Sequence, residues 1–175
     1  MSTIEIRKIS ITELDTDAIV NAANSDLLAG GGVCGAIFRA AGYGPLQDAC
    51  DKIGHCDTGS AVITPGFHLK AKYVIHAVGP IWRGGKHGEP EQLYSAYRAS
   101  LALAKENACR SIAFPLISSG IYGYPLEEAW ERAISACLDF IGSDPEGGID
   151  IIFAVLSDHV QEVGLRILRE KKITG

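Results

Sequence analysis

Small polar residues and glycines between Val20 and Gly35 form the segment of this sequence best suited to chemistry. The side chains of Asn21 and Asn24 can donate and accept hydrogen bonds without carrying charge. The run Gly30–Gly32 follows, where glycines let the backbone approach a ligand and the first amides of a helix favour an anion. The segment therefore predicts a site for a phosphate group with a sugar attached.

A second loop of similar composition spans 118–125 and has the sequence Ser118-Ser119-Gly120-Ile121-Tyr122-Gly123-Tyr124-Pro125. Each loop follows a predicted buried strand and precedes a predicted helix, which is where ligands bind in open α/β sheets. One such loop is equally compatible with an ordinary connection whose glycines serve only a tight turn. Two loops at equivalent places in one sheet favour a shared pyrophosphate site.

Alternating strand-like and helix-like segments are expected to position these loops. Strands are predicted around Ile4 and Ile6 and at 18–23, 60–64, 73–78, 112–117 and 149–156. Helices are predicted at 35–41, 46–53, 90–107, from Pro125, and after Ser157 as an N-cap. The segment 73–78 is nearly all apolar, which indicates burial on both faces. One α/β layer sandwich over residues 1–175, with a mixed or parallel sheet, is the simplest organisation.

Composition argues against several classes of function. The net charge of −5 disfavours a nucleic-acid surface, and no apolar run approaches the roughly 20 residues that cross a membrane. Residues 1–5 contain neither the basic region nor the apolar core of a signal peptide. The five cysteines are scattered and form no CxxC pair, and the histidines show no ligand spacing. We therefore expect no disulfide framework, no metal, no cofactor and a cytoplasmic location.

The two loops together resemble the signature loops of the macrodomain family. The resemblance rests on Asn21-Ala22-Ala23-Asn24, Gly30-Gly31-Gly32-Val33, the loop 118–125 and the strand 72–80, and extends from about Ile4 to about Leu168. It is nearest to the branch of deacetylases of O-acetyl-ADP-ribose that also remove mono-ADP-ribose from acidic side chains. It implies a three-layer α/β/α fold with a six-stranded mixed sheet, and ADP-ribose or a derivative, free or linked to a protein, as the ligand.

The resemblance also implies roles for individual residues. Asn24 corresponds to the asparagine that contacts the distal ribose, and Ala22 belongs to the same binding motif. The loop covering one side of the diphosphate corresponds to Gly31, Gly32 and Val33. The second diphosphate loop and the aromatic beside the distal ribose correspond to Ser118, Ser119, Gly120, Ile121 and Tyr122. Backbone amides in a concave loop bind phosphate oxygens without lysine or arginine, which suits these loops.

Cys34 departs from the family pattern, because members of the hydrolase branch carry an aspartate after the glycine run. That carboxylate is implied to activate water or to orient the ribose. A thiol replaces it as a base only if its pKa falls, as a helix N-terminus can cause, whereas burial acts in the opposite direction. Cys34 is therefore a catalytic candidate beside Asn24, while the structural alternative, a small buried cysteine, is the favoured interpretation.

Two further departures lie at the adenine end of the implied site. Ser10, followed by Ile11, occupies the place where the family carries an aspartate that accepts a hydrogen bond from the adenine amino group. A hydroxyl accepts that bond but can also donate one, so selection of adenine over a carbonyl-bearing base should weaken. Leu156 stands where an aromatic usually stacks on adenine and offers apolar contact only. We expect the adenine end to be weakened and the phosphate and ribose end to be kept.

Two other groups of residues have ordinary structural interpretations. His76 lies inside the predicted strand 73–78, so a hydrogen-bonded core histidine is favoured over a catalytic base. The basic segment 82–88 is favoured as a solvated turn over a site for a phosphate or an acidic partner.

Three functions remain open from the sequence. The first is hydrolysis of an ester at the distal ribose of ADP-ribose, with Asn24 positioning the ribose and water and a substrate phosphate as the base. The second is a reader that binds ADP-ribose without turnover, which the loss of the carboxylate favours and the lack of an attached domain disfavours. The third is a related nucleotide with a different base, suggested by Ser10 and Leu156.

Overall fold

The computed structural model describes residues 2–174, with side chains for residues 2–172. Six strands, five α-helices and one short 3-10 helix alternate along these residues. In chain order they are β1 (Thr3–Lys8), η1 (Ile11–Glu13), β2 (Ala18–Ala22), α1 (Gly32–Ala41), α2 (Tyr43–Ile53), β3 (Ala61–Pro65), β4 (Tyr73–Ala77), α3 (Glu89–Glu106), β5 (Ser111–Phe114), α4 (Leu126–Ser143), β6 (Asp150–Val155) and α5 (Asp158–Thr174).

The six strands form one mixed sheet in the order β1-β6-β5-β2-β4-β3. Neighbouring strands are parallel except for β3, which runs antiparallel to β4 at one edge. Strand β4 is buried along Val74–Ala77, which confirms the prediction from its apolar sequence. The mixed six-stranded sheet implied by the family resemblance is thus confirmed.

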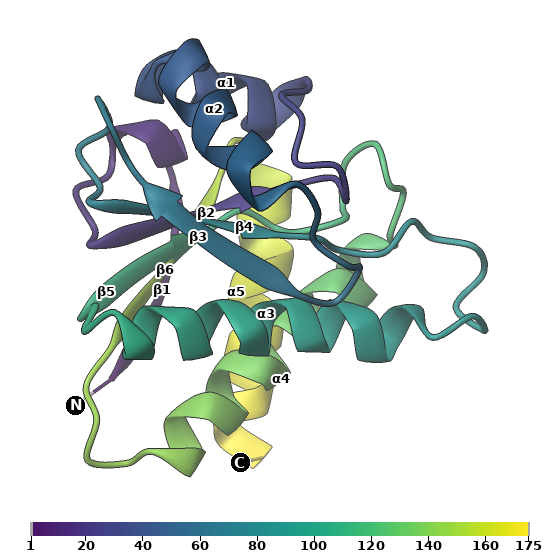
Figure 1. The fold of residues 1–175 in the computed structure, drawn as a ribbon. Coiled ribbons are helices and arrows are strands. Elements are labelled where there is room, and N and C mark those ends of the chain that lie inside the picture. Colours follow the sequence, from purple (N-terminus) through teal and green to yellow (C-terminus); the bar gives the residue numbers. More distant parts are fainter. Residues whose placement is uncertain (1, 175) are drawn as a thin grey trace.

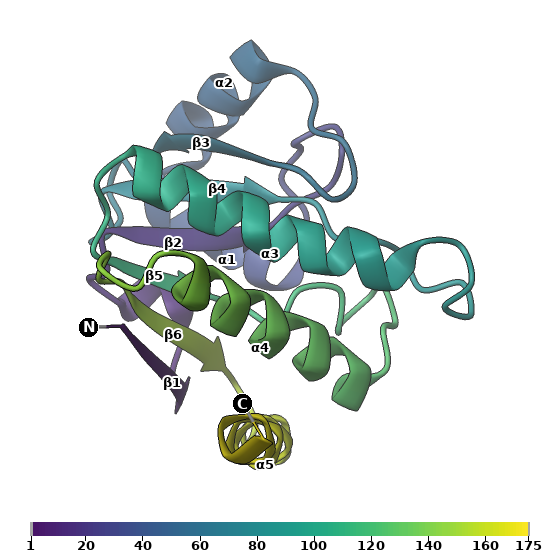
Figure 2. The same ribbon diagram turned by 90° about the horizontal axis from the view of Figure 1, so that it is seen from below.

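Helices cover both faces of the sheet and complete the three layers (Figure 1). Helices α3, α4 and α5 pack on one face, where α3 and α4 lie side by side (Figure 2). Helices α1 and α2, with η1, cover the other face. Each face buries its own apolar cluster, because a central strand with apolar side chains on both faces needs cover on both. The predicted three-layer α/β/α class is confirmed.

Local rules explain where several elements begin and end. Strand β5 stops at Phe114, three residues before the predicted end, because Pro115 has no N–H to continue the ladder. Pro125 is the N-cap of α4 and not its first helical residue. Ser157 caps α5 as predicted, since its Oγ accepts the N–H of Val160 at 3.2 Å. The sequence interpretation missed η1.

Helix α2 begins earlier than its sequence suggested. The residues Gly42, Gly44 and Pro45 were expected to separate two helices, but only Gly42 does so. Pro45 lies in the first turn of α2, where its missing N–H has no intrahelical partner to lose.

Within residues 2–174, no helix combines the length and the apolar character needed to cross a lipid bilayer.

Candidate functional site

The carboxyl ends of the five parallel strands meet at one edge of the sheet, and the residues singled out in the sequence gather there. Along this edge, Ser10 follows β1, Leu156 follows β6, Ser118–Tyr122 follow β5 and Asn24 follows β2. The loops after β2, β5 and β4 lie together at the right of Figure 1. Because parallel strands end at the same edge, residues up to 146 positions apart in the sequence converge there.

Asn24 and Cys34 converge on one backbone group, the carbonyl of Leu28. The Asn24 side chain donates from Nδ2 to that oxygen at 2.8 Å, and its Oδ1 accepts the N–H of Leu28 at 3.0 Å. The thiol of Cys34 donates to the same oxygen at 3.8 Å, and its residue is only 7% exposed. The carboxamide keeps one N–H and one lone pair for a ligand, whereas the thiol lies inside the protein.

The glycine run forms the N-terminus of α1. Gly31 is the N-cap, and the helix starts at Gly32 with a φ of 57°, a conformation that favours glycine. A Cβ on Gly35 would lie 2.6 Å from the carbonyl oxygen of Gly30, so glycine at position 35 lets the loop cross close over the helix. The first amides of a helix have no intrahelical partners, which leaves the N–H groups of Gly32 and Val33 available to an anion.

The second loop is held by hydrogen bonds at its base and presents amides at its tip. The Oγ of Ser118 donates to Pro80 O at 2.8 Å, and its carbonyl accepts the N–H of Tyr124 at 2.9 Å. Ser119 Oγ donates to the carbonyl of Leu116 at 2.8 Å. Within the part of the chain that the structure describes, the N–H groups of Gly120, Ile121 and Tyr122 have no hydrogen-bond partner. These amides can bind phosphate oxygens.

The adenine end of the predicted site offers few polar groups to a ligand. The hydroxyl groups of Ser10 and Thr12 lie 2.9 Å apart and hydrogen-bond to each other. Ile11 is buried, and Leu156 is 73% exposed. Neither loop contains a basic residue, and among residues 2–174 no group of three His, Cys, Asp or Glu side chains could hold a metal ion.

His76 is a core residue, as predicted, and does not face the candidate site. Its Nδ1 lies 3.1 Å from Asn21 Nδ2, and its Nε2 lies 2.9 Å from Thr64 Oγ1 and 3.8 Å from Cys50 Sγ. An amide donor at Nδ1 puts the ring proton on Nε2, where Thr64 accepts it. Burial lowers the pKa of His76 to about 4, so the ring is neutral near pH 7.

A model of the Macro domain family matches residues 20–133 of the chain. The chain belongs to the macro domain family. The matched residues include both loops, the strands β4 and β5 and the last three residues of β2. The resemblance inferred from the loop sequences is thereby confirmed.

Relatives of this macro domain include proteins named for catalysis and proteins solved with nucleotides. The O-acetyl-ADP-ribose deacetylase of Salmonella gallinarum is 56% identical over 144 residues, covering 80% of both chains. The Oceanobacillus iheyensis macrodomain, solved with ADP, superposes with a TM-score of 0.94 at 36% identity and covers 99% of this chain and 94% of its own. A Trypanosoma brucei macrodomain in complex with ADP-ribose has a TM-score of 0.85 at 37% identity, covering 98% and 69%.

The macro domain also contains a feature that sequence reasoning missed. A cavity of about 260 Å³ lies between the first loop, the second loop and the β4–α3 loop (residues 78–88), and we call it the β4–α3 cavity. Ser25 and Tyr122 line it from the two predicted loops. Glu89, at the start of α3, is 1% exposed and lines it from the third side. The only sequence signal was an acidic residue directly after the glycine-rich segment 84–88.

Proposed function

We propose that this macro domain binds ADP-ribose along the carboxyl edge of its sheet and hydrolyses an ester at the distal ribose. The observation that carries the proposal is the meeting of the two amide-bearing loops, since Ser25 beside Asn24 and Tyr122 of the second loop line one cavity. Strands β2 and β5, which precede these loops, are adjacent and parallel. Two sets of unpaired amides side by side suit a diphosphate without needing a basic side chain.

The deacetylase of Salmonella gallinarum and the Trypanosoma brucei complex support the choice of ligand and reaction. In the proposed reaction, the oxygen of a water molecule adds to the acyl carbonyl carbon and the bond from that carbon to the ribose oxygen breaks. The ribose oxygen takes a proton, and the products are a carboxylic acid and ADP-ribose. The acyl group is acetyl or the side chain of an ADP-ribosylated acidic residue.

In this scheme Asn24 positions the ribose and the water, and a phosphate oxygen of the substrate accepts the water's proton. The two hydrogen bonds to Leu28 fix the carboxamide before a ligand arrives. A fixed carboxamide speeds hydrolysis because it holds the ribose and the water in the geometry of the reaction. Cys34 serves as a packing residue, because its thiol is buried and already donates to the carbonyl of Leu28. A thiolate there would face that carbonyl oxygen and lose this bond.

The turnover of O-acetyl-ADP-ribose by the wild type, Asn24→Ala and Cys34→Ser tests the reaction. We expect release of acetate by the wild type, a large loss in Asn24→Ala and near-normal release in Cys34→Ser. Calorimetry with ADP-ribose distinguishes the hydrolase from a reader that binds without turnover. Binding without acetate release identifies a reader, and no heat at high micromolar concentration excludes both functions.

A ligand with another base is a second candidate, favoured by the adenine end of the site. Ser10 already pairs with Thr12, and the exposed Leu156 offers no ring to stack on a base. Equal affinity for ADP-ribose and its inosine counterpart would support this candidate.

We also propose that residues 1–175 are one macro domain acting in the cytoplasm, which suits five unpaired cysteines.

A further inference from the structure

The β4–α3 cavity lies one strand beyond the proposed distal-ribose position. In the sheet order, β1 and β6 lie at one side, β2 follows β5, and β4 comes next. A ligand with its base near Ser10 and its distal ribose near Asn24 therefore points its far end toward the exit of β4. That end would pass between Ser25 and Tyr122, which both line the cavity.

The loop around the cavity is held in place by one carboxylate. Glu89 accepts the backbone N–H groups of Arg83 at 2.8 Å, Gly85 at 2.9 Å and His87 at 2.6 Å. Burial alone raises the pKa of the Glu89 carboxyl, but hydrogen bonds from Gly85, Arg83, its own backbone and His87 lower it to about 2. The carboxylate is therefore ionised near pH 7, and its charge stabilises the backbone N–H groups of its own loop.

Two contacts connect this loop to the second diphosphate loop. The N–H of Trp82 donates to the carbonyl of Tyr122 at 2.9 Å. The Trp82 ring packs on Tyr124 with centroids 4.7 Å apart. The cavity therefore exists before a ligand binds, which reduces the entropy lost on binding.

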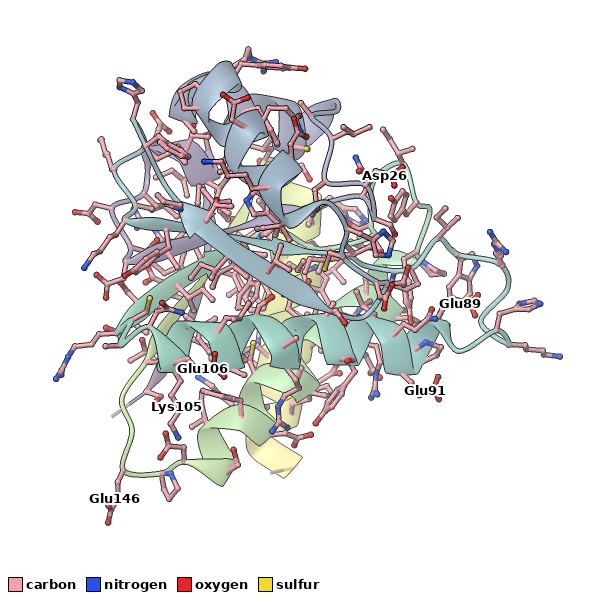
Figure 3. The ribbon with its side chains drawn as sticks, viewed as in Figure 1. Asp26, Glu89, Glu91, Lys105, Glu106 and Glu146 are labelled. Carbon is pink, nitrogen blue, oxygen red and sulfur yellow. The ribbon has the colours of Figure 1, made fainter. Side chains whose placement is uncertain are left out.

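Arg83 lines the cavity and is exposed to solvent, and its guanidinium group has hydrogen-bond donors available to a ligand. Within residues 2–172, no ion pair or side-chain hydrogen bond of its guanidinium group is found, and the oxygens of Glu89 are occupied. Gln92 and Ser25 add uncharged hydrogen-bonding groups to the wall. Asp26 and Glu91 lie at the same end of the molecule (Figure 3) but do not line the cavity. A guanidinium group beside amide and hydroxyl donors is the chemistry that recognises a carboxylate.

The volume of the cavity limits the group that it can hold. The cavity has a volume of about 260 Å³. That is more than an acetyl group fills and less than the roughly 300–1,000 Å³ of sites for drug-sized ligands. A short acyl chain with a polar end fits this range.

We propose that the β4–α3 cavity is the subsite for the acyl group of the substrate and that Arg83 selects acyl groups carrying a second carboxylate, such as the half-ester of a short dicarboxylic acid. The inference rests on the proposed binding of ADP-ribose at the same edge. Arg83 contacts the far end of the acyl chain in this arrangement and takes no part in breaking the ester.

Calorimetry with amide analogues of the esters, which resist hydrolysis, tests this subsite. The distal ribose carries acetyl, butyryl or succinyl; the last two have equal chain lengths and differ in the terminal carboxylate. We expect the wild type to bind the succinyl analogue about tenfold more tightly than the butyryl one, as one charge-assisted pair provides. Arg83→Gln should abolish this ratio and Arg83→Lys should keep part of it. Arg110→Gln, an equal charge change at the opposite edge before β5, should leave it intact.

The outcomes separate this inference from the function on which it rests. Binding of ADP-ribose with equal affinity for butyryl and succinyl, or a preference that survives Arg83→Gln, overturns the inference and leaves the proposed function standing. Tighter binding of an analogue acylated by a glutamate within an acidic tripeptide overturns the assignment to a short acyl chain. No binding of ADP-ribose itself overturns both.

Discussion

The side chains of Asn24 and Cys34 hydrogen-bond to the same carbonyl oxygen, that of Leu28, at 2.8 and 3.8 Å. They lie ten positions apart in the chain, and the loop between them, which contains the glycine run, folds back so that both reach this oxygen. The carboxamide is partly exposed and the thiol is buried, so one of the two is available to a ligand. We therefore expect mutations of Asn24 and Cys34 to have different effects on turnover.

Asn24→Ala should reduce kcat/KM for O-acetyl-ADP-ribose by roughly 10²-fold, because a misplaced ribose loses the alignment that accelerates the reaction. Steady-state kinetics measure the change. Asn107→Ala is the matched control, since Asn107 also donates from Nδ2 to a backbone carbonyl, that of Leu103, at the far end of α3. An unchanged rate in Asn24→Ala would remove this residue from the mechanism.

Cys34→Ser should keep turnover within about twofold of wild type, since a hydroxyl also donates to the carbonyl of Leu28 and the sulfur has no chemical step in the scheme. Alkylation of Cys34 by iodoacetamide in the native protein should be slow, because the residue is only 7% exposed. Rapid alkylation coupled to loss of activity would instead indicate a reactive thiolate.

Ser10→Asp should raise the preference for ADP-ribose over its inosine counterpart. A carboxylate only accepts hydrogen bonds and so favours the adenine amino group, whereas the serine hydroxyl also donates. Competition calorimetry with the two ligands measures the preference. A wild-type protein that already discriminates strongly would show that the pair formed by Ser10 and Thr12 does not weaken base selection.

Gly79→Ala should destabilise the protein by about 1–3 kcal/mol and loosen the second loop. A Cβ at position 79 would lie 2.3 Å from Ser118 Oγ and 2.5 Å from Ile117 Cγ2. Chemical denaturation measures the free energy of unfolding. Gly44→Ala is the control, since nothing lies within 4 Å of its added Cβ in α2, and it should be neutral or stabilising by up to about 1 kcal/mol.

The stability of the protein should depend on pH through His76. Its pKa is about 4 when folded and 6.5 when unfolded, so the unfolded chain binds the proton first as pH falls. The free energy of unfolding should therefore be level above pH 6.5 and fall by roughly 3 kcal/mol toward pH 4.

Denaturation of the wild type and of His76→Gln across this range isolates the effect. The variant keeps hydrogen-bonding groups near Asn21 and Thr64 but does not titrate, so its curve should be flatter between pH 5 and 6.5. Parallel curves for the two proteins would assign the acid sensitivity to other groups.

The sequence by itself determined the loops, most element boundaries and the family. Glycine runs, N-caps such as Ser157 and the apolar period of the strands are local properties, because backbone sterics and side-chain alternation act over a few residues. It also determined that His76 lies in the core, because the strand around it is apolar on both faces.

Only the tertiary structure decided which side chains share a hydrogen-bond partner and which charged groups are already hydrogen-bonded within the protein. In the sequence Glu89 is only an acidic residue after a glycine-rich segment, yet folding surrounds it with three backbone N–H groups, which hold the β4–α3 loop in place. The convergence of Asn24 and Cys34 on Leu28 and the cavity between Ser25 and Tyr122 depend on how adjacent parallel strands place their loops. Such contacts depend on distances in space, and no local sequence pattern encodes them.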